Sequence, residues 1–170
     1  MKSTIVYVVV IVVGVVIGSA PSYAQSSERP GPAVEIFAGH AGFVDDSTIP
    51  HTVLGGAGRF YFSPRLAAGP EFAYMWGPRL DRDIVLTGNL TWDLLRENGS
   101  NPPIVVPFIV GGVGAFRHNE GFGGHTETTF TAGGGTRVRI NDRLYGLVDF
   151  RIGWELHYRI TGGIGVKLSK

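Results

Sequence analysis

The sequence predicts an all-β fold, a closed, antiparallel, up-and-down transmembrane β-barrel of about eight strands. Three observations predict it. Eight runs of residues alternate in polarity between turn signals, charged side chains keep to one face of these runs, and aromatic residues gather at the ends of the runs.

The N-terminus has the pattern of an export signal. Lys2 precedes an apolar run from Ile5 to Ile17, and a patch of small residues ends at Ala24. A run of about 13 residues is too short to span a bilayer as a helix, which needs roughly 20. We therefore expect a cleaved signal peptide over residues 1–24 and export through the Sec pathway, followed by a short tail over 25–32 and the barrel over 33–170. A short N-terminal anchor is the alternative.

Eight runs have the length and composition of strands. Each spans about ten to thirteen residues, which suits a tilted strand that crosses a bilayer. Gly, Pro, Asn, Asp and Ser fill the connections, and most connections are too short to join parallel strands. The runs are Ala33 to Phe43, His51 to Phe62, Leu66 to Trp76, Asp83 to Leu95, Ile104 to Phe116, Thr128 to Ile140, Arg143 to Trp154 and His157 to Leu168.

The two faces of the runs differ in polarity. In all eight runs the even-numbered residues include no Asp, Glu, Lys or Arg, and the odd-numbered residues hold the charges. A soluble periplasmic binding barrel alternates too, but with its apolar set inward. Aromatic residues at both ends of the runs, Phe108 and Phe116 among them, favour a lipid-facing even set, because aromatic rings settle at membrane interfaces. The predicted interfacial aromatics are Tyr74, Trp76, Trp92, Trp154 and Tyr158.

Hydrocarbon leaves no partner for an open sheet edge, so the sheet is expected to close. The interior of a barrel of about eight strands is only wide enough for side chains to fill it. We therefore predict a packed polar lumen, with an ion-conducting lining as the alternative. Pro70 lies inside the third run and cannot donate to the ladder, which predicts a bulge or a missing bond there. The predicted lumen charge network is Glu35, Arg59, Glu71, Asp149, Arg151 and Arg159.

Several stretches resemble the outer-membrane β-barrel domain family, the small barrels similar to outer membrane proteins A and X and to opacity proteins. They are PFIVGGVGAF (107–116), FTAGGGTRVRINDRL (130–144), the closing DFRIGWELHYRITGGIGVKL (149–168) and the hairpin GGAGRFYFSPRLAAGPEFAYMW (55–76). The resemblance implies an eight-stranded barrel in the outer membrane that the barrel-assembly machinery inserts. Family members usually end in an aromatic residue, whereas this chain ends VKLSK.

We expect no catalytic residue, cofactor or metal. Lipid A deacylases share the style of the PFIVGGVGAF strand, and their site resembles a His-x-Ser pair. Here Tyr158 and Arg159 follow His157, and no serine lies in the eight runs. Histidines on a glycine-rich connection such as RHNEGFGGHTE more often interact with water and keep the loop solvated than bind a metal. Without Lys2 the formal charges balance, so nucleic acid is not an expected partner.

The sequence thus predicts an outer-membrane barrel of a Gram-negative-type bacterium, with a structural or surface-interaction role. The expected partners are outer-membrane lipid, the barrel-assembly machinery, periplasmic chaperones, and a surface or host ligand. The candidate contacts for that ligand are His118, Glu120 and His125. A narrow passive channel for small solutes and a lipid A-modifying enzyme are the alternatives.

Overall fold

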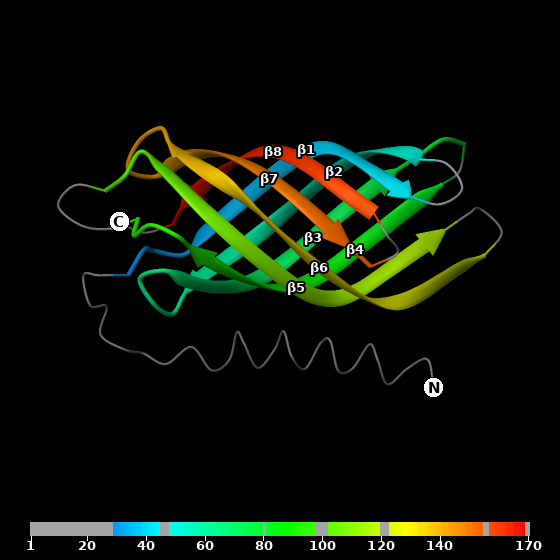
Figure 1. The fold of residues 1–170 in the computed structure, drawn as a ribbon, viewed down its shortest axis with the longest axis horizontal. Coiled ribbons are helices and arrows are strands. Elements are labelled where there is room, and N and C mark those ends of the chain that lie inside the picture. The colour runs from blue at the N-terminus through cyan, green and yellow to red at the C-terminus, as the bar shows by residue number, and fades with distance from the viewer. Residues whose placement is uncertain are drawn as a thin grey trace.

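Eight antiparallel strands close into one barrel in the computed structural model. The structure describes residues 29–44, 48–79, 81–97, 102–119, 123–154 and 157–168, so the predicted signal peptide lies outside the described residues. Consecutive strands pair with each other, and the last strand pairs with the first (Figure 1). The strands are β1 (Ala33–Val44), β2 (Thr48–Tyr61), β3 (Leu66–Trp76), β4 (Arg82–Asp93), β5 (Val105–Asn119), β6 (Gly124–Arg139), β7 (Leu144–Gly153) and β8 (His157–Lys167).

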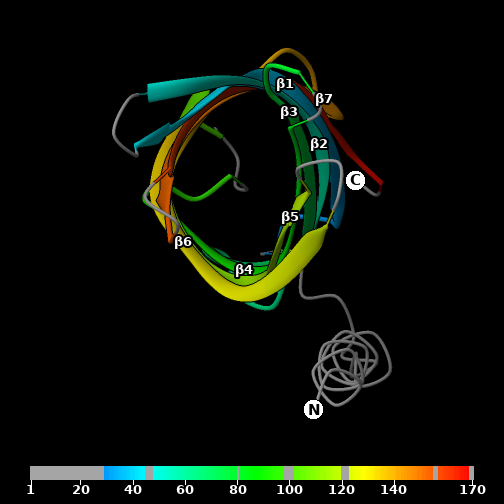
Figure 2. The same cartoon turned by 90° about the vertical axis from the view of Figure 1, so that its right-hand side faces the viewer.

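Closure occurs between β1 and β8, where Ala33 lies opposite Lys167 and Phe43 lies opposite His157. Seen along its axis, the barrel is a ring of tilted strands (Figure 2). We call the end that carries Ala33 and Lys167 the near end and the opposite one the far end. Among the described residues, no helix is long and apolar enough to cross a membrane.

Side-chain hydrogen bonds fix two of the near-end turns. The Ser63 hydroxyl accepts from the backbone N–H of Leu66 at 2.9 Å in the turn between β2 and β3. The Asn141 side chain accepts from the N–H groups of Arg143 and Leu144, at 2.9 and 2.8 Å, in the turn between β6 and β7. Both are local side-chain-to-backbone bonds of the kind that favours Ser and Asn in turns.

Pro70 interrupts the ladder between β2 and β3. Pairing runs from Thr52 to Ala57, skips the positions opposite Pro70 and Gly69, and resumes at Phe60 opposite Ala68 in the same register. Proline has no N–H to donate, which accounts for the gap. The missing-bond form of the prediction is therefore confirmed, and there is no bulge here.

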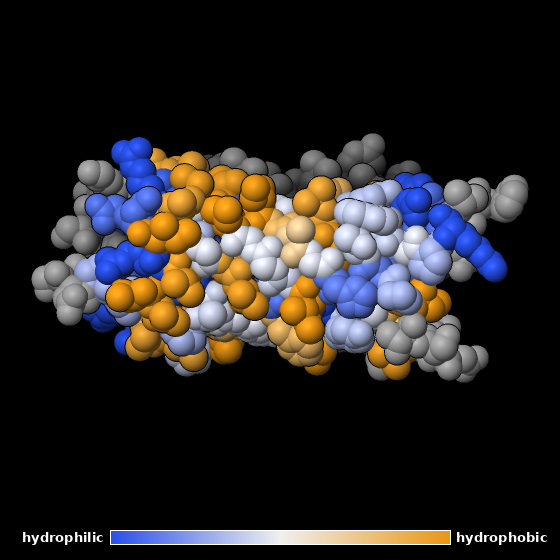
Figure 3. Space-filling view, turned by 90° about the horizontal axis from the view of Figure 1, so that it is seen from above, coloured by the Kyte–Doolittle hydropathy of each residue, from blue (hydrophilic) through white to orange (hydrophobic). Residues whose placement is uncertain are grey.

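The outer wall is apolar and the charges point inward. Val148, Ile152 and Ile164 are each about half exposed, whereas Glu71, Arg137 and Arg159 are buried. Figure 3 shows hydrophobic residues along the wall and hydrophilic residues toward the two ends. This arrangement is the reverse of that in a soluble barrel, which packs its apolar side chains inside.

The even-face prediction is wrong for β5. On this strand the even-numbered Val106, Phe108 and Phe116 are buried in the lumen, and the odd-numbered Ile109 and Val113 face outward. Opposite residues of an antiparallel pair lie on the same face, and even residues of β4 lie opposite odd residues of β5. The β5 run is apolar on both faces, so its alternation carries no signal about which face is inside. Phe108 and Phe116 therefore do not belong to the interfacial aromatics.

Candidate functional site

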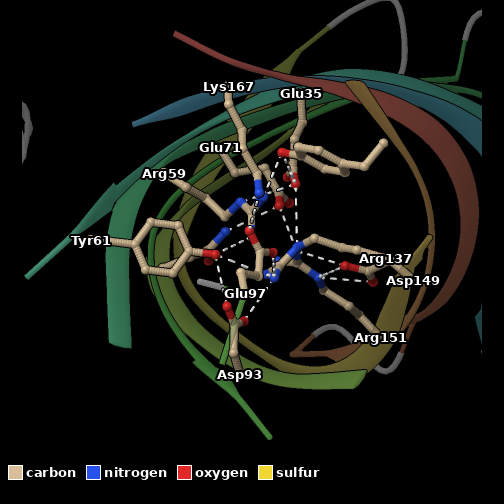
Figure 4. Close-up of polar contacts among 12 residues, drawn as sticks. Glu35, Arg59, Tyr61, Glu71, Asp93, Glu97, Arg137, Asp149, Arg151 and Lys167 are labelled. Atoms are coloured by element: carbon tan, nitrogen blue, oxygen red, sulfur yellow. Dashed lines mark hydrogen bonds and ion pairs between the residues drawn. The ribbon is translucent and has the colours of Figure 1, made fainter. Parts of the chain in front are cut away.

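The near half of the lumen contains an ion-pair network centred on Arg137 of β6. The Arg137 guanidinium contacts Asp93 at the end of β4 at 2.8 Å and Glu97, just beyond that strand, at 2.9 Å. Glu97 also pairs with Lys167 of β8 at 3.0 Å. The connection after β4 thus turns inward and places a carboxylate in the near mouth of the barrel. Figure 4 shows these side chains converging on the barrel axis.

Two tyrosines link the next pair into this network. Arg59 of β2 and Glu35 of β1 form an ion pair at 3.0 Å. The Tyr145 hydroxyl donates to Glu35 at 3.0 Å and accepts from Arg59. The Tyr61 hydroxyl accepts from Arg59 at 2.9 Å and donates to Asp93 at 2.7 Å. Each phenol therefore joins a cation on one strand to an anion on another.

Glu71 of β3 is the centre of the second group, farther along the lumen. Its two carboxylate oxygens contact Arg159 and Arg151, each at 2.7 Å, and its Oε2 accepts from Asn89 at 3.1 Å. Arg151 also donates to both oxygens of Asp149, its second neighbour along β7. Glu71 is 2% exposed, so its charge is stabilised by these partners and not by water.

The network is electrically balanced, which permits its burial. Removing charges from water is costly unless each is paired and hydrogen-bonded. Among the described residues the two groups together pair five acids with five bases: Glu35, Glu71, Asp93, Glu97 and Asp149 with Arg59, Arg137, Arg151, Arg159 and Lys167.

Glu97 lies outside the strands, and its surroundings favour its charged form. Burial alone would raise the pKa of this carboxyl. The cations of Arg137, Arg59 and Lys167 outweigh burial and hold the pKa of Glu97 below its ordinary value. Glu97 is therefore an anion at neutral pH and keeps its contacts to Arg137 and Lys167.

Toward the far end the lumen becomes apolar, which the predicted polar lumen does not include. Arg159 lies 5.0 Å from the Phe37 ring centre and Arg137 lies 4.4 Å from that of Phe108. The apolar layer consists of Phe37, Ala41, Val53, Ala73, Met75, Val85 and Phe116, with Phe43 and Ala57 packed against it.

Beyond the apolar layer lies a second polar cluster. His51 of β2 contacts Asp81 and Asp83, at 2.9 and 3.3 Å. His118 of β5 contacts Asp83. These residues form the far mouth of the lumen, and their chemistry is considered below.

The predicted outer-loop contacts do not lie together on a loop. His118 belongs to β5 and points into the lumen, while His125 belongs to β6, is exposed, and contacts Glu127 at 3.1 Å. The β5–β6 hairpin is longer than predicted, because His118 pairs with His125 in the ladder. Glu120 lies outside the described residues. A ligand contact by any of these side chains stays a prediction.

All five predicted interfacial aromatics lie on the outer face. Trp92 is at the near end, and the other four are at the far end. Three ring contacts occur there, between Tyr74 and Trp76 at 5.8 Å, between Trp154 and Phe130 at 5.5 Å, and between Tyr158 and His40 at 6.4 Å. Aromatic rings at both rims, with an aliphatic wall between them, match the two interfaces of a bilayer.

The structure brings together all six residues of the predicted charge network and adds four that sequence reasoning missed as members. Asp93 and Arg137 stand at odd-numbered positions like the six, so their signal was present. Glu97 and Lys167 meet only because the chain after β4 folds inward. Alternation along strands cannot reveal a contact made by a connection.

Solved structures with the same architecture are small membrane barrels. The chain superimposes on neisserial surface protein A (NspA) with a TM-score of 0.70 at 11% identity, covering 81% of this chain and 97% of that one. The N-terminal β-barrel domain of Pseudomonas aeruginosa OprF gives 0.64 at 10% identity, with 81% and 97% covered. This is the fold of small eight-stranded outer-membrane barrels. The outer membrane protein OprG of Pseudomonas aeruginosa has it too, with a TM-score of 0.60, 11% identity, and 84% and 98% covered.

Sequence comparison adds no narrower grouping within this fold. No protein-family model and no curated protein matches the chain.

Proposed function

We propose that the protein is an outer-membrane β-barrel that contacts lipid through its apolar wall and is exported through the Sec pathway. Its fold and the outward-facing aliphatic and aromatic side chains support this. An even number of strands puts Ala33 and Lys167 at the same end, and we assign that near end to the periplasm. Insertion would then depend on the barrel-assembly machinery and periplasmic chaperones.

Cell fractionation tests the location. The full chain is expected in the outer-membrane fraction and to run faster on a gel before boiling than after, as a closed barrel does. Recovery in the soluble fraction without detergent would contradict the proposal.

The lumen is proposed to be sealed. Glu71 and Met75 each lie two positions from Ala73 on β3, and they are 2% and 0% exposed. A paired ionic layer and an apolar layer thus follow one another along the lumen. An ion passing through would have to break buried salt bridges and then cross an apolar layer. The observation that carries this proposal is the burial of Glu71 between Arg151 and Arg159.

Planar-bilayer recording distinguishes a sealed barrel from the narrow channel. We expect no conductance steps from the wild-type protein. Met75→Ala with Phe116→Ala and Glu71→Ala removes material from both layers, and this triple variant is expected to show steps. Reproducible steps of one size from the wild type would support the channel instead.

With a sealed lumen, the role is structural or lies in surface interaction through the far-end connections. NspA, a neisserial surface protein with this fold, supports surface exposure of a barrel of this shape. His125 and Glu127 form an exposed pair on β6 that a partner could reach. Replacing both by Ala should reduce attachment of expressing bacteria to cultured epithelial cells, whereas replacing Asp142 of the near-end turn should not. Equal attachment by all three strains would argue for a purely structural role.

We further propose that the protein is not an enzyme. The chain has no cysteine that could act as a nucleophile. Ser63 lies in the turn between β2 and β3, where its hydroxyl accepts a hydrogen bond from the backbone. Overexpression is expected to leave the lipid A of the host unchanged by mass spectrometry. A new lipid A species that depends on this chain would overturn the assignment.

A further inference from the structure

Four metal-ligating side chains meet at the far mouth of the lumen, apart from the near-end ion-pair network. His51 comes from β2, Asp81 from the turn between β3 and β4, Asp83 from β4, and His118 from β5. One ligand atom each from His51, Asp81 and Asp83 lies within 4.8 Å of the others. His118 Nδ1 lies beside this group of three and contacts the other oxygens of the two carboxylates, 3.8 Å from Asp81 Oδ1 and 2.5 Å from Asp83 Oδ1.

The hydrogen bond of His51 to a backbone carbonyl leaves its other ring nitrogen facing two carboxylates, an arrangement that a cation would stabilise. His51 Nδ1 is 3.2 Å from the carbonyl oxygen of Ile49. A carbonyl can only accept, so Nδ1 carries the ring proton and Nε2 of neutral His51 presents a lone pair. That lone pair faces Asp81 Oδ2 at 2.9 Å and Asp83 Oδ2 at 3.3 Å. Three electron-rich atoms therefore converge on a point that needs a positive charge, either a proton or a metal ion.

Burial adds a second, independent observation. The side chains of His51 and Asp83 are each 1% exposed. Asp83 Oδ2 and Asp81 Oδ1 are both buried, and neither has a hydrogen-bond partner among the residues that the structure describes. An unsatisfied carboxylate oxygen in a buried place is costly, and coordination to a metal removes the cost.

The spacing and type of the donors fit zinc. Zinc takes imidazole nitrogens and carboxylate oxygens at about 2.0–2.2 Å, which in a tetrahedron sets neighbouring ligand atoms roughly 3.4 Å apart. The distances from His51 Nε2 to the two aspartate oxygens, 2.9 and 3.3 Å, are close to that spacing. A mixed set of two histidines and two aspartates suits transition metals better than calcium or magnesium, which prefer oxygen ligands.

Neighbouring groups hold the two histidine rings in fixed orientations. The bond from His51 Nδ1 to a backbone carbonyl is the usual way that a ligating histidine is fixed. The Phe43 ring packs edge-on against His51 at 4.7 Å, and Phe116 stacks on His118 at 6.4 Å. A Cβ at Gly77 would collide with His51 Nε2, so only glycine leaves the ring in place.

The contacts of Arg82 are to backbone oxygens. Arg82 Nη1 donates to the backbone carbonyls of Asp81 at 2.7 Å and Gly77 at 3.4 Å. The ion-pair contacts of the Asp81 and Asp83 carboxylates among the described residues are to His51 and His118.

We propose that His51, Asp81, Asp83 and His118 bind one zinc-type divalent transition-metal ion at the far mouth of the lumen. The ion would join β2, β4, β5 and the β3–β4 turn and close the lumen on the side away from the chain termini.

The test uses the full-length mature barrel without a histidine tag, refolded in detergent and stripped with a chelator. Zn²⁺ alone is titrated by calorimetry, and bound metal is counted by elemental analysis after gel filtration. We expect one Zn²⁺ per chain and a higher unfolding temperature when zinc is present. Cobalt(II) in place of zinc should give the strong visible absorption of a tetrahedral site.

Variants locate the ion. Asp83→Asn and His51→Gln should each weaken zinc binding at least about 100-fold, because they remove a ligand and not merely its support. Gly77→Ala should weaken binding by displacing the His51 ring. His125→Gln is the matched control, because this exposed histidine lies next to His118 without joining the cluster, and it should bind zinc like the wild type.

Each outcome bears on the proposal. Heat-modifiable gel mobility first establishes that a variant is a closed barrel, so lost binding is not lost folding. Absence of a stoichiometric zinc ion in the folded wild type would overturn the site and leave a shared proton as the cation. Binding lost with His125→Gln but kept with Asp83→Asn would place the ion on the exposed hairpin and also overturn it.

Discussion

Glu71 of β3 and Arg159 of β8 form an ion pair of 2.7 Å across the lumen, between strands that are not neighbours in the barrel. Arg151 of β7 holds the other oxygen of the same carboxylate. One buried anion thus joins opposite walls.

Removal of the Glu71 carboxylate should destabilise the barrel strongly. Glu71→Ala leaves two buried arginines without their shared partner, and breaking a buried pair in this way costs about 3–5 kcal/mol. Denaturant unfolding in lipid vesicles, followed by tryptophan fluorescence, measures the change. Glu127→Ala removes an acid from an exposed pair and should change the unfolding free energy by less than about 0.5 kcal/mol. Similar values for the two variants would contradict the structural role of Glu71.

Glu97 should give the barrel an acid-sensitive part of its stability. Its pKa is lower in the folded protein than in the unfolded chain, although burial opposes this, because Arg137, Arg59 and Lys167 favour the anion. The contribution is therefore complete above the unfolded pKa, about 4.3, and is lost as the pH falls through the lower folded pKa.

The comparison that isolates this effect is between the wild type and Glu97→Gln. Denaturant midpoints measured from neutral pH down to about pH 3 should converge at the acid end, since the wild type loses an advantage that the variant lacks. Asp142→Asn, in the exposed near-end turn, should follow the wild type. A constant gap between wild type and Glu97→Gln at all pH values would refute the assignment.

Spin labels should show that the even-numbered residues of β5 face the lumen, whereas those of the other strands face outward. The chain has no cysteine, so single-cysteine variants can be labelled cleanly. Labels at Val113 and Val148 are expected to sense acyl chains and dissolved oxygen, because both side chains face outward. A label at Val110, which is 6% exposed, should be immobile and protected. An aqueous signal at Val148, or acyl contact at Val110, would be incompatible with the structure.

Gly165 makes room for Tyr145, so a methyl group there should be harmful. A Cβ at Gly165 would overlap the Tyr145 ring, which bridges Arg59 and Glu35. Overpacking of this kind costs about 1–3 kcal/mol. Gly162→Ala on the same strand is the control, since its new Cβ would come no closer than 3.8 Å to Leu147 O. Thermal unfolding should separate the two variants, and equal midpoints would mean that Tyr145 is free to move.

Much of the barrel could be predicted from alternation, and β5 shows why the rest could not. Seven strands have charges on one face, which identifies the lumen side. Strand β5 has only apolar residues and glycine on both faces as far as Phe116, and its only Arg, Lys, Asp or Glu is Arg117, which comes at the far end and points outward. Which face of β5 points into the lumen depends on its register with β4. The sequence of a single strand does not contain that information.

The candidate sites also differ in how far the sequence alone predicts them. The inward charges of β1, β2, β3, β7 and β8 followed from position, because neighbours in a narrow barrel have to meet. The cluster of His51, Asp81, Asp83 and His118 depends on a turn between β3 and β4 and on the β5 phase, so sequence reasoning put His118 on a loop instead. The apolar layer was missed because Met75, Val53 and Val85 occupy positions that were assumed to be polar.

The seam between β1 and β8 bears on how the polypeptide reaches this state. Ala33 meets Lys167, so a chain lacking its final 11-residue strand has two bare sheet edges that its own residues cannot cover. A partly assembled barrel is therefore not a stable state. The strand at the C-terminal end, β8, pairs with the first strand, β1. Joining such distant segments carries a large loop-closure entropy, which places the topology among slow folders and makes assembly an all-or-none event that waits for the whole polypeptide.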